Sequence, residues 1–163
     1  SDGGPLVEAA AGARVPGGHD HIVVAGPQLD EDRFARAQAL AGPSTTVVRS
    51  CPGLAHRIRE AAAVVAMGGY NTVCEILATS TPALIVPREK PRLEQAIRAR
   101  ALSRASAIDT ARQEAATPDL LSQWLAGAVR SRTDRSHVEL GGLAAAARAA
   151  TRLLTRTPEG EPA

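Results

Sequence analysis

Residues 67–87 read MGGYNTVCEILATSTPALIVP, a stretch that contains a glycine turn, a short helical segment and an apolar strand. The segment 62–67, which leads into the turn, and the segment 83–86, which follows the helix, are both continuously apolar. Short apolar runs of this kind are typical of strands buried on both faces in a parallel sheet. The stretch therefore predicts a strand–helix–strand unit with parallel strands.

The same alternation of strands and helices continues in both directions along the chain. The predicted strands cover 21–25, 45–49, 62–67, 83–86 and 107–108. The predicted helices cover 5–13, 30–41, 54–61, 71–79, 93–103, 118–130 and 139–155. This order predicts an α/β fold, a doubly wound parallel sheet with helices on both faces. Ligands of such sheets bind beyond the carboxyl ends of the strands, which here precede the loops 1–4, 26–29, 50–53 and 68–71.

The amino-acid composition limits the kinds of partner that the chain is expected to bind. The chain has 163 residues, enough for one domain with a proper core. Aromatic residues make up only 2% and the net charge is +2, which disfavours a nucleic-acid partner. Two cysteines form no disulfide framework, and no Cys/His cluster has the spacing of a metal site. Without a run of about 18 apolar residues, we expect a cytoplasmic chain.

The turn itself has the chemistry of an anion site. Gly68 and Gly69 remove side chains that would block a ligand, and the following helix begins with unpaired N–H groups. Asn71 and Thr72 can cap the helix or donate to phosphate, and each such interaction is worth roughly 0.3–2 kcal/mol. Glu75 has two interpretations. It either holds ribose hydroxyls, or it completes a capping box with Thr72 and pairs only with a backbone N–H.

A longer pattern resembles a known family. The segments GGYNTVCEILA (68–78), TPALIVP (81–87) and EQA (94–96) resemble the donor-binding half of GT-B glycosyltransferases. The resemblance is strongest to the family 28 C-terminal domain, typified by the N-acetylglucosaminyltransferase that forms lipid II. It covers most of residues 1–155 in element order and is sharp over 64–100. It implies a Rossmann-like C-terminal half that binds a UDP-sugar such as UDP-N-acetylglucosamine.

The resemblance assigns roles to individual residues. It places the donor ribose at Glu75, the base at the backbone of Ser50 and Cys51, and the sugar hydroxyls at Glu94 and Gln95. The residues expected to face the diphosphate are Gly3, Gly4, Gly68, Gly69, Tyr70, Asn71 and Thr72. Ser1 to Gly4 resembles the end of a glycine-rich loop that follows a first strand.

A basic cluster follows the strand at 83–86. Arg88, Lys90 and Arg92 sit where they can neutralise a diphosphate whose charge grows as UDP leaves, or they form a solvated loop. Two positions depart from the family pattern. Thr81 replaces the usual glycine before proline, and the segment 90–92 replaces a His-Asp type segment.

The resemblance also predicts the organisation of the protein. Residues 1–156 form a donor domain that lacks its first strand, 157–163 form a disordered tail, and the N-terminal acceptor domain is absent. Family members transfer the sugar with inversion of its anomeric configuration. They require no metal at the phosphates and no cofactor, and their general base comes from the acceptor domain. We therefore expect an acceptor domain or subunit as partner, and none of the four histidines is assigned as the base.

Alternatives stay open at this point. The chain is otherwise a catalytically silent nucleotide-sugar-binding or interaction module, or half of a nucleotide-sugar 2-epimerase. An NAD domain is disfavoured, because the chain has no Gly-x-Gly-x-x-Gly followed by an acidic residue. Arg148, Arg152 and Arg156 either form a solvated helix face or make a peripheral contact at the inner face of the membrane. Cys74 is expected to be a small core residue.

Overall fold

The computed structural model describes residues 3–88 and 93–139. Its strands are β1 (His21–Val24), β2 (Thr45–Val48), β3 (Val64–Ala66), β4 (Ala83–Ile85) and β5 (Asp109–Thr110). Its helices are α1 (Gly4–Ala11), α2 (Glu31–Leu40), α3 (Leu54–Glu60), α4 (Tyr70–Leu77), α5 (Glu94–Arg104), η1 (Gln113–Ala115) and α6 (Pro118–Ala128). The predicted alternation is confirmed, with β5 displaced by two residues from the expected 107–108. The predicted helix 139–155 and the tail 157–163 fall almost entirely outside the described residues.

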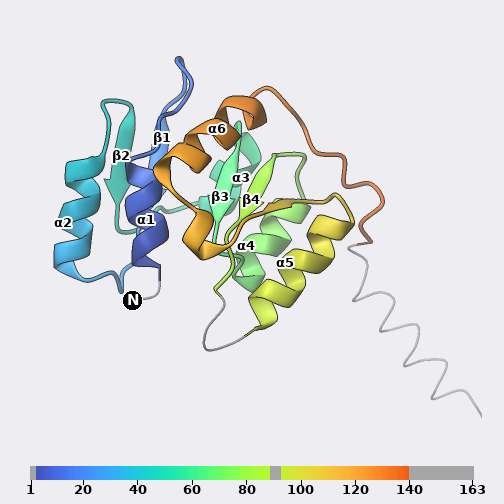
Figure 1. Ribbon diagram of the computed structural model, residues 1–163. Coiled ribbons are helices and arrows are strands. Elements are labelled where there is room, and N and C mark those ends of the chain that lie inside the picture. The colour runs from blue at the N-terminus through green and yellow to red at the C-terminus, as the bar shows by residue number, and fades with distance from the viewer. Residues whose placement is uncertain (1–2, 89–92, 140–163) are drawn as a thin grey trace, which may run out of the picture.

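The strands are all parallel, as predicted, but they form two sheets. β1 pairs with β2 in one sheet, and β3, β4 and β5 form the other in that order. Figure 1 shows the pair β1 and β2 on one side of the molecule and β3 and β4 near its centre. Within the described part of the chain, no backbone ladder joins β1 to β3.

Helices cover both faces of the three-stranded sheet. On one face, side chains of α1 and α6 pack against Leu84 and Val86. On the other face, side chains of α3, α4 and α5 surround Ala83 and Ile85. The prediction of helices on both faces is therefore confirmed for this sheet, because successive residues of β4 point to opposite sides and all are buried.

The two-stranded sheet is packed differently. Val23 and Val47 point into a core that α1 and α2 close. Their neighbours Ile22 and Thr46 point to the opposite face, where Ile22 is 42% exposed. In the part of the chain that the structure describes, helices thus cover only one face of this pair.

Polar contacts fasten the loop before β4. Thr81 is buried, and its hydroxyl donates to the Ile58 carbonyl over 2.9 Å. The Arg135 guanidinium donates to the carbonyls of Thr79, Thr81 and Ala107 over 2.7, 2.9 and 2.6 Å. Thr81 departs from the family pattern. Its hydroxyl satisfies the Ile58 carbonyl in the last turn of α3, which a glycine at position 81 would leave without this donor.

His21 makes the stability of the fold depend on pH. Its Nδ1 lies 3.2 Å from Thr45 Oγ1, and burial lowers the pKa of the imidazole below the ordinary value of 6.5. At pH values below that ordinary value the unfolded chain binds more protons than the folded one, so the free energy of unfolding falls as the pH drops through the folded-state pKa. We expect His21→Gln to reduce the loss of stability seen by denaturant titration between about pH 7.5 and pH 5.

The exposed His56 supplies the control for this prediction. His56→Gln should retain the pH dependence of the parent chain, since an exposed ion pair with Glu60 contributes little. An unchanged pH dependence in His21→Gln would contradict the assignment.

Candidate functional site

The turn after β3 has a geometry that only glycine fits at its first position. Gly68 has a φ of +80°, in the left-handed region, and a Cβ at this residue would lie 2.8 Å from Ile85 Cγ2. Gly69 has a φ of −55° and open space around it. The first glycine is thus required by the fold, whereas the second leaves room in front of the helix.

Helix α4 begins earlier than the sequence predicts. Gly69 is its N-cap, no described side chain caps this end, and the Val73 N–H donates to the Gly69 carbonyl over 2.9 Å. The N–H groups of Tyr70, Asn71 and Thr72 precede that first helical hydrogen bond and so point out of the helix end. Three predicted diphosphate residues, Tyr70, Asn71 and Thr72, therefore lie within the first turn.

This start decides against the capping box. Thr72 is the third residue of the helix rather than its cap, and Glu75 lies in the second turn instead of the first. Glu75 is half-buried, and its carboxylate makes no hydrogen bond or ion pair with any described residue. Because Asn71 and Glu75 are four residues apart, they share one face of α4.

A second helix end meets this turn. Gly3 is the N-cap of α1, and the Val7 N–H donates to its carbonyl over 3.1 Å. A Cβ on Gly3 would lie 3.0 Å from Met67 Cε, on the residue that immediately precedes Gly68. The predicted segments Gly3–Gly4 and Gly68–Thr72 are therefore brought together, with two helix N-termini at one sheet edge.

Arg98, a residue that the sequence patterns did not indicate, supports the turn from α5. Its Nη1 donates to the Gly68 carbonyl over 3.2 Å, and its guanidinium stacks over the Tyr70 ring with 5.3 Å to the centroid. Arg98 lies on α5 four residues after Glu94 and three after Gln95. That helical spacing from two predicted ligands is the signal that would have pointed to it.

The predicted sugar ligands lie at the start of the same helix. Glu94 is the first residue of α5 and is exposed. Gln95 is half-buried, and its Oε1 accepts a hydrogen bond from the Arg88 backbone N–H over 3.2 Å. Arg88 is thereby held beside the carboxyl end of β4, whereas Arg92 lies outside the described residues.

The predicted base pocket belongs to the other sheet. Ser50 and Cys51 follow the carboxyl end of β2, where Ser50 is exposed and the Cys51 thiol points to the Pro52 carbonyl over 3.9 Å. No hydrogen bond or ion pair among the described residues links them to the turn after β3. The expectation that Cys74 is a core residue is wrong, because its side chain is exposed on α4.

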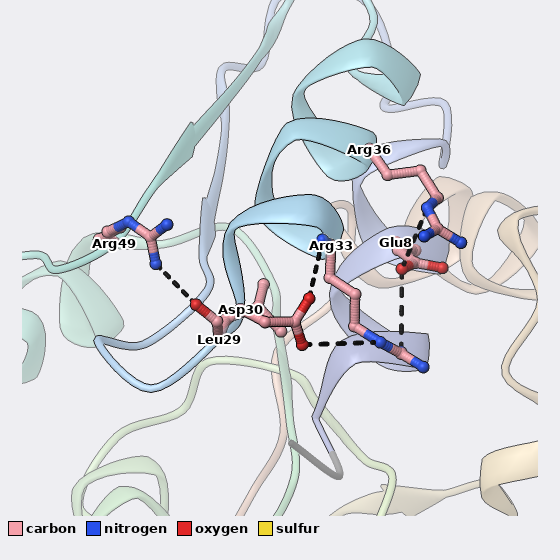
Figure 2. Close-up of polar contacts among 6 residues, drawn as sticks. All are labelled: Glu8, Leu29, Asp30, Arg33, Arg36 and Arg49. Carbon is pink, nitrogen blue, oxygen red and sulfur yellow. Dashed lines mark hydrogen bonds and ion pairs between the residues drawn. The ribbon is translucent and has the colours of Figure 1, made fainter.

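A polar cluster surrounds the loop after β1, as Figure 2 shows. Asp30 caps α2 by accepting from the Arg33 N–H over 3.0 Å, and this hydrogen bond lowers the pKa of its carboxyl. The Arg33 guanidinium also lies 3.8 Å from Glu8 on α1. Arg49 donates to the Leu29 carbonyl over 2.8 Å. These contacts join α1, α2 and the end of β2 at the carboxyl edge of the strands, the edge at which the turn after β3 also lies.

Neither a metal-binding cluster nor a membrane-spanning helix occurs among the described residues. They contain no group of three or more His, Cys, Asp and Glu side chains suited to a metal ion. None of their helices has the length and apolar character needed to cross a membrane. The arginines at 148, 152 and 156 lie outside the described residues.

The fold is that of the Rossmann-like C-terminal half of GT-B glycosyltransferases. The MurG protein of Acinetobacter baumannii superposes with a TM-score of 0.65 at 22% identity, covering 91% of this chain and 44% of that one. The glycotransferase of kitacinnamycin gives 0.57 at 18% identity, over 78% of this chain and 30% of that one. Glycosyltransferase VinC, solved in complex with DTDP, gives a TM-score of 0.57 at 18% identity, covering 91% of this chain and 37% of that one.

Residues 21–151 match the glycosyltransferase family 28 C-terminal domain, and the chain belongs to this family. The predicted resemblance is thus confirmed. The chain spans less than half the length of the solved proteins just described. Among curated proteins, no significant sequence match was found.

Gly68 and Gly69 offer a matched pair for testing the turn. Gly68→Ala should lower the free energy of unfolding by about 1–3 kcal/mol, because it combines left-handed strain with overlap on Ile85. Gly69→Ala should stay within about 0.5 kcal/mol of the parent chain, because the poorer alanine cap is offset by the lower backbone entropy of the unfolded chain. Denaturant unfolding measures both, and equal costs would contradict the geometry.

Arg98 is tested in the same way. Arg98→Ala should cost about 1 kcal/mol of stability and accelerate amide exchange at the start of α4, since the Gly68 carbonyl loses its donor. Arg100→Ala, at an exposed position of the same helix, should change neither quantity. Unchanged exchange of the Val73 amide, the first hydrogen-bonded amide of α4, in the Arg98 variant would show that Arg98 does not hold the turn.

Proposed function

We propose that this chain is the donor-binding domain of an inverting glycosyltransferase and that it holds a UDP-sugar, such as UDP-N-acetylglucosamine, at the carboxyl edge of β3. The observation that carries the proposal is the contact of Gly3 with Met67, which sets the N-termini of α1 and α4 side by side. Each of these N-termini carries unpaired backbone N–H groups and the positive end of a helix dipole. Two such N-termini side by side suit the negative charges of a diphosphate.

Glu75 is proposed to hold the ribose. Its carboxylate lies one helical turn beyond the anion-binding N–H groups, on the face that Asn71 shares. An ionised carboxylate only accepts hydrogen bonds, so it suits the two hydroxyl donors of a ribose and not a phosphate. The absence of a described partner for Glu75 leaves it available for this role.

The other predicted residues complete the proposed site. Ser50 and Cys51 contact the base through their backbone, and Glu94 and Gln95 bind hydroxyls of the sugar. Arg88 and Arg92 offset the negative charge that accumulates on the diphosphate as the glycosidic bond breaks. Arg98 acts as a positioning residue, because it fixes the carbonyl of the phosphate-binding turn.

Turnover needs a further domain or subunit in this proposal. An inverting transfer requires a general base beside the attacking hydroxyl of the acceptor. His21 opens β1 and thus lies at the amino end of the strands, opposite the proposed site. We therefore assign acceptor binding and the base to an N-terminal acceptor domain or a partner chain. A cytoplasmic location with a peripheral membrane contact stays a prediction.

Titration calorimetry with UDP tests the donor site. We expect UDP to bind weakly and Glu75→Gln to weaken binding by about 1.5–3 kcal/mol, the range for a hydrogen bond to a charged group. Glu60→Gln is the matched control, since Glu60 ends α3 at the other edge of the sheet and pairs only with His56 among described residues. NAD serves as the ligand control.

Circular dichroism establishes that each variant is folded before the titration. Loss of binding in Glu75→Gln alone supports the ribose assignment. Equal UDP affinities of the two glutamate variants, or equal affinity for NAD, would overturn it. Binding of UDP without transfer after an acceptor domain is supplied would favour the silent nucleotide-sugar module.

A further inference from the structure

Tyr70 presents an exposed aromatic ring in the first turn of α4. It is one of three aromatic residues in the chain. Phe34 and Trp124 are partly buried and pack against hydrophobic cores, whereas Tyr70 is 65% exposed and belongs to none of the three cores. The ring therefore gives the fold little buried apolar surface. A single exposed apolar side chain is common in folded proteins, so the role of this ring depends on the groups around it.

Arg98 holds the Tyr70 ring in a fixed position. The guanidinium lies over the ring at 5.3 Å from its centroid, and Nη1 of the same side chain donates to the Gly68 carbonyl over 3.2 Å. One cation thus contacts both the ring and the backbone two residues before it. Because a cation is attracted to the face of an aromatic ring, the ring is oriented before any ligand binds. A ligand that stacks on it loses less free energy to the ordering of this side chain.

The same arginine connects the ring to the first turn of α5. Arg98 follows Glu94 by four residues and Gln95 by three, so these side chains share one face of the helix. Side chains of a helix lean toward its N-terminus, which directs the guanidinium and the ring beneath it toward this first turn. The Tyr70 ring therefore lies beside both the phosphate-binding turn and the residues proposed to bind sugar hydroxyls.

A flat apolar face bordered by polar groups matches the chemistry of a hexopyranose. Such a sugar carries C–H groups on one face, which bury well against an aromatic surface, and hydroxyls around its rim, which need hydrogen bonds. The Glu94 carboxylate accepts such bonds. The Gln95 side-chain NH2 donates them, since Gln95 Oε1 already accepts from the Arg88 backbone N–H over 3.2 Å. A diphosphate has no apolar face, so the ring suits the glycosyl unit of a nucleotide sugar and not its phosphates.

We propose that the Tyr70 ring stacks against the glycosyl unit of a bound nucleotide sugar and contributes to the choice of that sugar. This inference rests on the proposed donor site. It adds a side-chain role to a residue that contacts the diphosphate only through its backbone N–H in that proposal. Arg98 is a positioning residue for the ring. Removal of the ring therefore reduces the preference of the chain for a UDP-sugar over UDP.

Calorimetric titration with UDP and with UDP-N-acetylglucosamine measures this preference as the ratio of two dissociation constants. We expect Tyr70→Leu, which keeps the backbone N–H but removes the ring, to lower the preference by about two- to tenfold, the range for the stacking of an aromatic pair. Tyr70→Phe keeps the ring and should keep the ratio of the parent chain. A variant that only loses stability weakens both affinities by the same factor and leaves the ratio unchanged.

Ile97→Ala is the matched control. Ile97 is 63% exposed on α5, beside Arg98 in the chain, and has no part in the proposed site. This variant removes exposed apolar surface without removing the ring, so its ratio of dissociation constants should equal that of the parent chain.

NMR of the Tyr70 ring gives an independent measurement. Tyr70 is the only tyrosine of the chain, so its ring signals are unambiguous. We expect UDP-N-acetylglucosamine to move these ring signals clearly more than UDP does. Both ligands should move the amide signals of Asn71 and Thr72, which lie in the first turn of α4.

The outcomes separate this inference from the donor site on which it rests. Amide shifts with both ligands, but no added ring shift with the sugar nucleotide and an unchanged ratio in Tyr70→Leu, would overturn the stacking role and leave the donor site standing. An equal change of the ratio in Ile97→Ala would also overturn it, because the effect would then belong to the apolar surface of α5. If neither ligand moves the α4 amides, the proposed donor site is wrong and the stacking role falls with it.

Discussion

The structure depends on one helix that packs in two directions. A two-stranded parallel pair such as β1 and β2 has only marginal stability by itself. Val7 and Ala11 of α1 pack against this pair. The opposite side of the same helix supplies Leu6 and Ala9 to the core beneath β4. The small side chains of Ala9, Ala10 and Ala11 let α1 approach both sheets closely. Loss of α1 packing would therefore open two of the three cores at once.

The same constraint builds the proposed site. The packing of α1 fixes its N-terminal end against Met67, and thereby beside the turn that starts α4. The groups proposed to face the phosphates thus come from α1, which packs on both sheets, and from α4, which packs on the three-stranded sheet alone. A ligand that bridges these two helix ends would bind the folded chain alone and stabilise it by mass action. In the proposed function, folding and ligand binding would be coupled through the position of one short helix.

Local patterns predicted the elements and the family but not the contacts between distant segments. Alternating apolar runs and glycine turns located β1 to β4 and their helices to within about two residues, the usual scatter of element ends. The start of α4 was misplaced because Gly69, and not Thr72, is its N-cap. Cys74 is exposed because it lies on the face of α4 that also carries the exposed Asn71 and Ala78, whereas Val73 and Ile76 face the core. The division into two sheets has no local signal, since periodicity does not encode strand order.

The contact between Arg98 of helix α5 and the Gly68 carbonyl, which the sequence does not predict, bears on the specificity of the proposed site. Arg98 binds the Gly68 carbonyl, whereas Gln95 accepts from the Arg88 backbone, so one helix face fastens the loops that follow β3 and β4. Arg98 lies thirty residues from Gly68 in the chain, and only the folded structure shows the pair. In the proposed site, the phosphate-binding turn and the sugar ligands therefore move as a unit. A substitution that tilts α5 would alter phosphate and sugar contacts together, whereas Glu75, on α4, would keep its place relative to the helix end.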